Sequence, residues 1–488
     1  MRRHVATLVA ALAAALLAGC GGGGSGSATD DALSFMPKDA PLAVAFQTDP
    51  NSDQYKQVNK LLGRFPFGGQ IKQQFKNGLS SSGYDFDKDV KPVLGNDFVV
   101  TVPTAAALQQ SNTPAIGALK AKDEGKAEEL VKKKSTKVGT AEGTDVYRSG
   151  SDTFLAVKDG VLVVTDSMAS MQDAMKRHSG GDHMTSDDLD AMLAGVEGQD
   201  GLARVGVNLQ AVIAADPKAR AVAQKVKWVG GLRKAGITAA ARSDGIEENF
   251  KVTTEGVSEA DLPLAPGAQA APLVRRASDI GFGTRDLGQV VRFFESVGQA
   301  TDQRGFARFT RNKAQFNRTL GIDVDRDVID QLEGDAAVSV GIDGGFAARS
   351  GVKDPAAFKA TLRKAVPKLP KAARGKPVRV AVPKSPNGFY TLAAANGKTY
   401  SFAVIGDKFV VATDAARAAQ FAGQSASPVP GAKGSLVTAL DARTIANQVA
   451  GKAGQAGASF FTGALGDATG WVDTETSGMT GRFKLTIK

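Results

Sequence analysis

Short runs of hydrophobic residues, broken by tight-turn pairs, recur along this chain and predict β-strands joined by hairpins. In the first half, residues 154–157 and 161–164 flank Asp159-Gly160; in the second, residues 390–394, 399–404 and 409–412 are separated by Asn396-Gly397 and Gly406-Asp407. Asn-Gly between two apolar runs is a strong hairpin signal. Consecutive hairpins indicate a mainly antiparallel sheet.

Apolar positions at helical spacing follow several of these strands. Asp123 and Asp354 stand where an N-cap is expected, and Pro355 takes the first helical position. Apolar faces are supplied by Leu130, Val131, Phe358 and Leu362, and further helices are expected over residues 54–62 and 286–297. The predicted fold class is α+β, each sheet carrying its helices on one face. Parallel βαβ winding is the alternative.

The chain matches itself at an offset of 238 residues. Residues 83–90 align with 321–328, and Leu94, Asp97, Val100 and Val102 align with Leu332, Asp335, Val338 and Val340. At slightly different offsets, Val44, Phe46 and Thr48 align with Ile280, Phe282 and Thr284. These matches predict two homologous tandem units, residues 32–258 and 273–488, joined by a linker over residues 259–272.

The N-terminus has the pattern of an export signal. Arg2 and Arg3 precede an apolar run over residues 5–17, which is shorter than the roughly 20 residues of a membrane span. Leu17-Ala18-Gly19-Cys20 resembles the lipobox of bacterial lipoproteins, which implies removal of residues 1–19 and lipid attachment, including palmitate, at Cys20. A Gly/Ser-rich tether is expected over residues 20–31.

Composition narrows the remaining chemistry. With 488 residues, of which 42% are hydrophobic and 23% charged, the chain can form at least two folded cores. Its single Cys excludes an internal disulfide framework, and three His leave little imidazole chemistry. Removal of residues 1–19 would change the net charge from +10 to +8.

The densest basic runs are Lys132-Lys133-Lys134 and Arg275-Arg276. They lack the interleaved aromatic residues of a single-strand nucleic-acid platform, so no nucleic-acid partner is expected. Solvated helix faces are the main interpretation, with weak attraction to anionic headgroups or acidic wall polymers as the alternative.

Two acidic runs invite a calcium interpretation. They are Asp85-x-Asp87-x-Asp89 and Asp323-x-Asp325-x-Asp327. An EF-hand loop requires Gly at its sixth position, where this chain has Val90 and Val328. Capping of short helices by Asp87 and Asp325 explains the spacing without a metal ion.

Other candidate motifs are incomplete. His178 and His183, near Asp182, Asp187 and Asp188, are expected in a polar loop, and Asn396-Gly397-Lys398-Thr399 is expected to be a hairpin turn, not a phosphate-binding loop.

Gly281-Phe282-Gly283 lacks the third Gly of a dinucleotide-binding loop, and Trp228, Phe461 and Trp471 are expected to pack in cores. We therefore assign no catalytic residue, no metal ligand and no cofactor.

The lipobox, the tether, the segment Phe35-Met36-Pro37-Lys38-Asp39-Ala40-Pro41 and the paired acidic runs together support a resemblance. The chain resembles an uncharacterised bacterial domain-of-unknown-function family (the 3352 family) of exported, often lipid-anchored proteins with two tandem repeats. The resemblance implies a location at the cell membrane, facing the extracytoplasmic side.

Two function classes follow. The first is a non-catalytic binding or scaffolding protein of the cell envelope, with a lipid or an envelope polymer as ligand. The second is an envelope hydrolase whose active site carries no recognised motif. An apolar pocket would favour the first class and a cleft with paired carboxylates the second.

Overall fold

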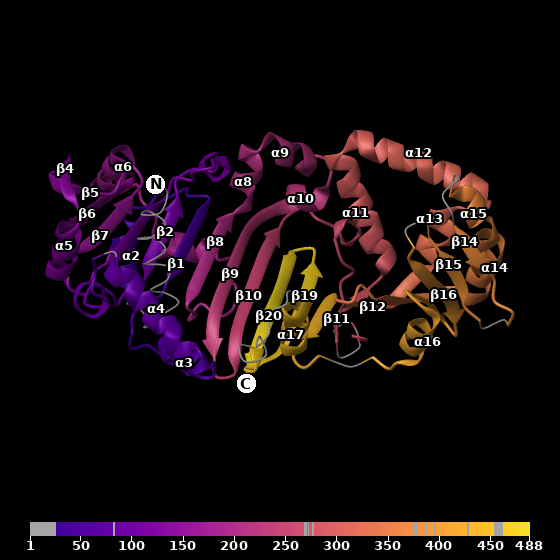
Figure 1. The fold of residues 1–488 in the computed structure, drawn as a ribbon. Helices are drawn as coiled ribbons and strands as arrows, with labels where there is room; N and C mark the ends of the chain where they lie inside the picture. Colours follow the sequence, from indigo (N-terminus) through magenta and orange to yellow (C-terminus); the bar gives the residue numbers. More distant parts are fainter. Residues whose placement is uncertain are drawn as a thin grey trace. The chain divides into compact units, whose positions relative to one another are not determined.

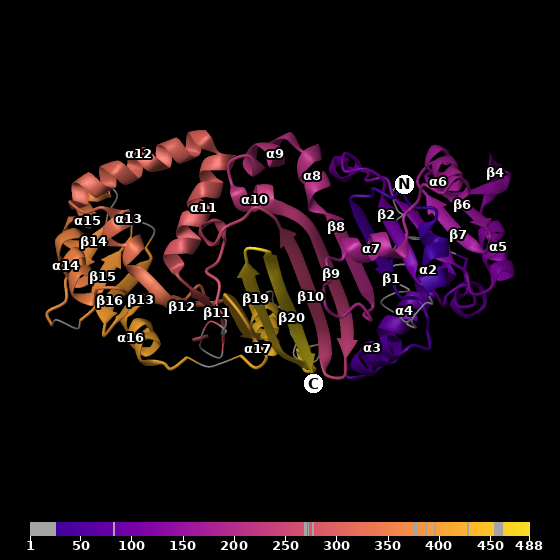
Figure 2. The same cartoon turned by 180° about the vertical axis from the view of Figure 1, so that it is seen from behind.

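The computed structural model describes residues 26–81, 83–267, 271, 273–275, 278–373, 378–385, 388–394, 397–426, 429–452 and 462–488. These residues form two compact units (Figures 1 and 2). Unit 1 comprises the chain up to Pro217 together with Leu232–Thr253 and Thr486–Lys488, and unit 2 comprises Lys218–Gly231 and Thr254–Leu485. Among the described residues, no helix is both long enough and apolar enough to cross a membrane.

Unit 1 is built on one sheet of ten strands. They are β1 (Leu42–Phe46), β2 (Phe98–Val102), β3 (Ile116–Lys120), β4 (Thr136–Ala141), β5 (Thr144–Ser149), β6 (Thr153–Lys158), β7 (Val161–Thr165), β8 (Ala203–Asn208), β9 (Leu232–Arg242) and β10 (Gly245–Thr254). The order across the sheet is β10-β9-β8-β1-β2-β3-β7-β6-β5-β4. Every pair from β9 to β4 is antiparallel, which confirms the predicted sheet type.

Unit 2 has ten strands in the same order. They are β11 (Asp279–Arg285), β12 (Leu332–Gly341), β13 (Phe346–Val352), β14 (Arg379–Ala381), β15 (Tyr390–Ala393), β16 (Thr399–Ile405), β17 (Lys408–Ala412), β18 (Leu436–Asp441), β19 (Leu465–Glu475) and β20 (Gly478–Ile487). The order is β20-β19-β18-β11-β12-β13-β17-β16-β15-β14. Adding ten to each strand number of unit 1 therefore gives the corresponding strand of unit 2.

Helices lie on both faces of each sheet, so the expectation of one covered face is wrong. In unit 1, α2 (Gly26–Leu33), α6 (Met168–Gly180) and α7 (Ser186–Met192) pack on the face that carries Ala43, Val99 and Val163. On the opposite face, α5 (Glu124–Lys133) and a π-helical turn, η1 (Phe86–Val90), cover Leu119, Leu155 and Leu162. Helices α3 (Asp53–Gly63), α4 (Gly68–Ser81) and α8 (Leu209–Ala215) also belong to unit 1, whereas α9 (Pro217–Ala223), apart from Pro217, and α10 (Lys227–Gly231) belong to unit 2.

Unit 2 has the same two-sided arrangement. Phe358 and Leu362 of α14 (Pro355–Ala365) pack on one face, and Ala418 and Phe421 of α16 (Ala415–Gly423) pack on the other. The remaining helices are α11 (Leu287–Thr301), α12 (Gln303–Leu320), α13 (Val324–Asp327), α15 (Leu369–Ala372) and α17 (Ala442–Lys452). The N-caps expected at Asp123 and Asp354, and Pro355 at the start of α14, are all present.

The folded part of unit 1 begins earlier than composition suggests. Residues 26–31, expected to belong to the tether, lie in α2, where Thr29, Ala32 and Leu33 are buried. Phe35 and Met36 follow directly and are fully buried, and the hydroxyl of Thr101 on β2 contacts the Met36 sulfur. Burial of these apolar side chains against the sheet stabilises a short helix that has weak intrinsic propensity.

Strand register corrects one sequence alignment between the units. Val44 lies opposite Val100 in unit 1, and Phe282 lies opposite Val338 in unit 2. When Val100 is aligned with Val338, as in the sequence comparison, the register places Val44 level with Phe282 and not with Ile280. A two-residue shift keeps the same side chains on the same face of a strand, so alternation alone could not detect the error.

Candidate functional site

One face of the unit 1 sheet carries apolar side chains in rows that cross four strands. Directly opposed residues of antiparallel strands point to the same face. Across β2, β1, β8 and β9 the three rows are Val102, Leu42, Val207 and Ala235; then Val100, Val44, Val205 and Ile237; then Phe98, Phe46, Ala203 and Ala239. We call these twelve residues the unit 1 apolar face.

The other side of the same strands is closely packed. A Cβ on Gly236 of β9 would lie 2.0 Å from the carbonyl oxygen of Leu193, and one on Gly206 of β8 would lie 2.7 Å from the Cβ of Met192. These two glycines let the end of α7 approach the backbone of β8 and β9. At β8 and β9, helix α7 therefore packs on the side opposite the unit 1 apolar face. At the β2 end of the unit 1 apolar face, Phe98 is buried and packs with Phe46 and Val100 in the cluster that includes α5, so the open part of this face lies toward β9.

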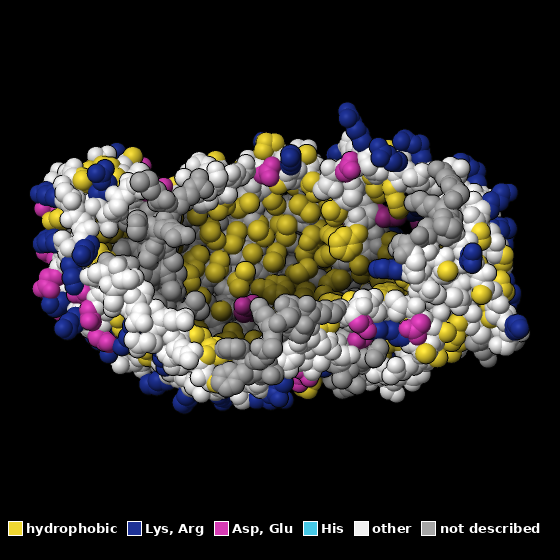
Figure 3. All heavy atoms as spheres, in the orientation of Figure 1, with side chains coloured by type: hydrophobic (Ala, Val, Ile, Leu, Met, Phe, Trp, Pro, Cys, Tyr) yellow, Lys and Arg dark blue, Asp and Glu magenta, His cyan; other side chains and the backbone are white. Residues whose placement is uncertain are grey.

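Among the described residues, α3 and α8 contact β9 near its ends. Gln54 of α3 accepts a hydrogen bond from the amide of Ala241, and α8 begins directly after Asn208, which pairs with Lys234. Ile237, at the middle of β9, remains 40% exposed. In Figure 3, drawn in the orientation of Figure 1, hydrophobic side chains cover the area of β8, β9 and β10.

Unit 2 presents an equivalent surface. Val338, Phe282, Thr438 and Gly470 form a row across β12, β11, β18 and β19, with Val340 and Ile280 in the next row. The Phe483 ring of β20 lies over Gly470. A Cβ added at Gly470 would be 3.0 Å from this ring. Phe282 and Phe483 are 36% and 48% exposed. We call Ile280, Phe282, Val338, Val340 and Phe483 the unit 2 apolar face.

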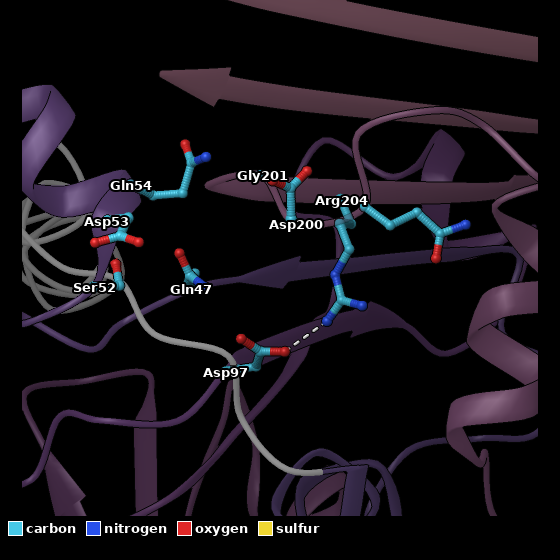
Figure 4. Close-up of a pocket in the computed structure, with 9 residues that line it drawn as sticks. Gln47, Ser52, Asp53, Gln54, Asp97, Asp200, Gly201 and Arg204 are labelled. Carbon is cyan, nitrogen blue, oxygen red and sulfur yellow. Dashed lines mark hydrogen bonds and ion pairs between the residues drawn. The ribbon is translucent and has the colours of Figure 1, made fainter. Parts of the chain in front are cut away.

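A polar pocket of about 360 Å³ lies in unit 1 (Figure 4). Its lining residues are Gln47, Ser52, Asp53, Gln54, Asp97, Gln199, Asp200, Gly201 and Arg204. Arg204 Nη2 of β8 donates to Asp97 Oδ2 at 2.5 Å, and the hydroxyl of Thr29 donates to the same oxygen at 3.3 Å. The pair thus links α2, the start of β2 and β8.

The environment of Asp97 is that of a structural ion pair. Burial raises the pKa of Asp97, while the neighbouring Arg204 and Thr29 act in the opposite direction. Ser52, which also lines the pocket, caps α3 by accepting a hydrogen bond from the Tyr55 amide. Among the described residues, Gln47 Oε1 is buried without a hydrogen-bond partner. A polar ligand group could donate to it, but these lining groups form no nucleophile and base pair.

The acidic runs cap helical turns, as expected, but through different residues. Asp85 and Asp323 are the N-caps, not Asp87 and Asp325. Asp89 and Asp327 each accept a hydrogen bond from the amide of the capping residue, at 2.6 and 2.8 Å. Within the described parts of the chain, no group of three or more His, Cys, Asp or Glu side chains could hold a metal ion.

The two histidines are not both in a loop. His178 lies in α6, where its ring stacks on Phe35 at a centroid distance of 4.2 Å and contacts Ser34 and Asp159. His183 lies in the loop after α6, and among the described groups its Nδ1 is buried without a partner. No local sequence pattern indicates this stacking, since Phe35 and His178 are 143 residues apart.

The remaining motifs are structural where they are described. Gly397 turns between β15 and β16 with a positive φ of 77°, as expected for a hairpin, and Gly281-Phe282-Gly283 is part of β11. Trp228 is buried, Lys132 and Lys133 form ion pairs with Glu128 and Asp89, and Trp471 lies on β19. Leu17, Ala18, Gly19, Cys20, Arg276, Asn396 and Phe461 lie outside the described residues.

Sequence reasoning missed most of the apolar faces. Alternation in residues 203–207 and 235–239 marks strands but does not reveal which face stays open. Arg204 was also missed, since its partner Asp97 is 107 residues away.

Comparison with solved structures gives only weak similarity. Five chains match, among them crystal forms III, IV and I of TP0453, at 8%, 10% and 9% identity and a TM-score of 0.27 in each case. The matches cover 46%, 47% and 46% of this chain and 81%, 83% and 79% of those chains. At this TM-score, nothing about function follows from the similarity.

A comparison with curated proteins gives no match. The profile of a family described as "Protein of unknown function (DUF3352)" matches residues 4–364, well over half of the 488 residues. This chain therefore belongs to the DUF3352 family of proteins of unknown function.

Proposed function

We propose that this chain is a non-catalytic, lipid-anchored protein of the bacterial cell envelope that binds a lipid or another apolar molecule on its open sheet faces. The observation that carries the proposal is the row Val100, Val44, Val205 and Ile237, which ends at a 40% exposed isoleucine at the middle of strand β9. A residue of this type, surrounded by apolar neighbours, is normally covered in a folded protein.

The energetics favour an apolar ligand on such a surface. Removing apolar area from water contributes about 25 cal/mol per Å², so covering a few hundred Å² gives several kcal/mol. Each apolar face is a sheet surface with neighbouring apolar side chains on adjacent strands, which suits an acyl chain. The polar groups that line the pocket in unit 1 belong to other residues. The unit 1 apolar face itself therefore carries no side chain that could act as a catalytic group.

Membrane attachment through Cys20 completes the proposal. The lipobox Leu17-Ala18-Gly19-Cys20 and the preceding apolar run support it, and two acyl chains would suffice for stable anchoring. A Cys20→Ser variant is expected to lose its lipid mass shift and to leave the membrane fraction. Retention of both properties would contradict the anchor without bearing on the apolar faces.

We also propose that the two units are homologous tandem repeats. Support comes from the identical order of ten strands in each unit and from the matched caps at Asp85 and Asp323. The register of Val44 with Val100 and of Phe282 with Val338 agrees with the 238-residue offset. Each unit then carries its own version of the apolar face.

The binding proposal can be tested by native mass spectrometry of the protein carrying Cys20→Ser, with the apolar faces otherwise wild type, purified without detergent and followed by organic extraction. The test variants are Ile237→Asp in unit 1 and Phe282→Asp in unit 2. The matched control is Val138→Asp, because Val138 is also 40% exposed but lies on β4, away from the unit 1 apolar face.

We expect a bound lipid or other apolar molecule in the wild type and in Val138→Asp, and a loss of bound material in the double variant. An apo mass for the wild type, together with no uptake of a fluorescent fatty acid, would overturn the proposal. Equal uptake by the wild type and the double variant would show that the apolar faces are not the binding site.

A further inference from the structure

Helix α12 of unit 2 has an unusual distribution of charge. Residues 303–320 contain five basic residues, Arg304, Arg308, Arg311, Lys313 and Arg318, and no acidic residue. The helix is capped at its N-terminus by Asp302 and ends at Gly321 in the left-handed conformation. Helix α12 is therefore an 18-residue helix with an excess of positive charge.

Four of these basic residues share one side of the helix. Arg304, Arg308, Arg311 and Arg318 are spaced at i, i+4, i+7 and i+14, and such positions fall on one face at 3.6 residues per turn. The row is about 21 Å long, at 1.5 Å per residue. All four residues are exposed. We call them the arginine row.

The opposite side of α12 holds the helix against unit 2. Lys313 lies about half a turn from the arginine row and forms ion pairs with Glu295 of α11 at 2.9 Å and Asp325 of α13 at 2.5 Å. Leu320 is buried on the same side. Among the described residues, no ion pair is formed by a member of the arginine row, so these guanidinium groups face solvent with their charge uncompensated.

The elements next to α12 extend the positive charge. The short helix η5 (Val366–Lys368) and α15 both contact α12, and Lys368 donates a hydrogen bond to the Leu320 carbonyl. Residues 355–373, which contain these elements, include five basic residues and no acidic one. Figure 3 shows Lys and Arg side chains projecting along the edge where Figure 1 places α12.

We infer that the arginine row of α12 docks on a membrane surface rich in anionic phospholipid headgroups. A cluster of at least four basic residues on an amphipathic helix is typical of proteins that bind such surfaces. Guanidinium groups form paired hydrogen bonds with phosphate, and a straight row can meet several headgroups of a flat surface at once. A single-stranded nucleic acid is a poorer fit, because the phenylalanines of α12 lie away from the arginine row.

This inference concerns a surface separate from both apolar faces and does not depend on the proposed apolar ligand. The test uses the full chain made by cell-free translation, in which Cys20 receives no lipid. It is mixed with vesicles of phosphatidylcholine alone, or of equal parts phosphatidylcholine and phosphatidylglycerol, and the vesicles are sedimented. The test variant replaces Arg304, Arg308, Arg311 and Arg318 with Gln.

The matched control removes four exposed charges from unit 1 by replacing Lys38, Lys60, Lys91 and Lys122 with Gln. Both variants therefore have the same net charge. A third variant replaces the arginine row with Lys, which keeps the charge and the helix propensity. Circular dichroism of each variant confirms that it is folded.

We expect the wild type to bind the anionic vesicles at least about tenfold more tightly than the neutral ones, with a loss of this preference at high salt. The Arg→Gln variant should lose the preference, the unit 1 control should keep it, and the Arg→Lys variant should lose only part of it. Equal binding to both vesicles, or an equal loss in both Gln variants, would overturn the inference. Dextran sulfate binding through the arginine row, without a preference among vesicles, would identify a soluble polyanion instead and also overturn it.

Discussion

Arg204 Nη2 lies 2.5 Å from Asp97 Oδ2, and the two side chains, 19% and 9% exposed, join β8 to the start of β2. Asp97 Oδ2 also accepts a hydrogen bond from the hydroxyl of Thr29, and this bond connects helix α2 to the sheet. Burial raises the pKa of Asp97. The ion pair therefore compensates a charge that would be costly on its own.

Replacing Arg204 with Met should lower the free energy of unfolding by about 3 kcal/mol, because Asp97 remains buried without its cation. The measurement is urea unfolding followed by circular dichroism. A carboxyl group with a raised pKa stabilises the fold at pH values below its ordinary pKa, and this contribution is lost as the pH rises through the raised value. The deficit of Arg204→Met should therefore shrink toward about pH 4. A deficit that is independent of pH would contradict this account of Asp97.

The paired variant Asp89→Asn and Asp327→Asn should be less stable at neutral pH and less sensitive to acid. The pKa of Asp89 is lowered, first by the hydrogen bond from Lys133, and that of Asp327 is lowered, first by the hydrogen bond from Arg326. A lowered pKa gives stability above the unfolded value of about 3.9 that is lost as the pH falls through the folded value. Each loss at neutral pH should be about 1 kcal/mol, as for a helix cap.

Thermal unfolding at neutral pH and at successively lower pH values provides the measurement. The melting temperatures of the wild type and the paired variant should converge as the pH falls below about 4. Parallel curves across the whole range would show that these carboxylates do not stabilise the fold through their charge.

Gly236→Ala should destabilise unit 1, while Gly78→Ala should not. A Cβ at Gly236 would lie 2.0 Å from the Leu193 carbonyl oxygen. The backbone at Leu193, at the end of α7, could relieve this clash only if α7 were displaced. We expect a loss of about 1–3 kcal/mol from this overpacking. Gly78 lies in α4 with no atom within 4 Å of an added Cβ, so Ala should stabilise the helix by about 0.5–1 kcal/mol. Equal unfolding midpoints for the two variants would contradict the close packing of β9.

The apolar faces should contribute to binding more than to stability. Ile237→Ser and Phe282→Ser remove partly exposed side chains, so each should lower the free energy of unfolding by about 1–2 kcal/mol, less than the loss of a fully buried residue. Uptake of a fluorescent fatty acid should nevertheless fall in the double variant. A large loss of stability with unchanged uptake would show that these residues serve packing alone, and the buried Val163→Ser in unit 1 provides a reference for such a loss.

Local sequence determined the elements whose signals are short-range. The caps at Asp123 and Asp354, the turn at Gly397 and the strands around Asp159-Gly160 depend on residues a few positions apart, and all appear where the pattern predicts them. Caps within acidic runs were harder to place. Asp85 and Asp87 are both suitable residue types, and only the backbone conformation of Asp85, which lies outside the helical turn, selects it.

Contacts between distant residues decided the rest. Alternation predicts that a strand has two different faces, but the packing of α7 against Gly206 and Gly236 determines which face of β8 and β9 remains open. In the same way, the ion pairs of Lys313 with Glu295 and Asp325 determine that the arginine row of α12 faces solvent. The sequence by itself determined many of the strands and helices and the antiparallel pairing of the hairpins. The tertiary structure decided which surfaces are open to a ligand, because exposure depends on what the rest of the chain covers.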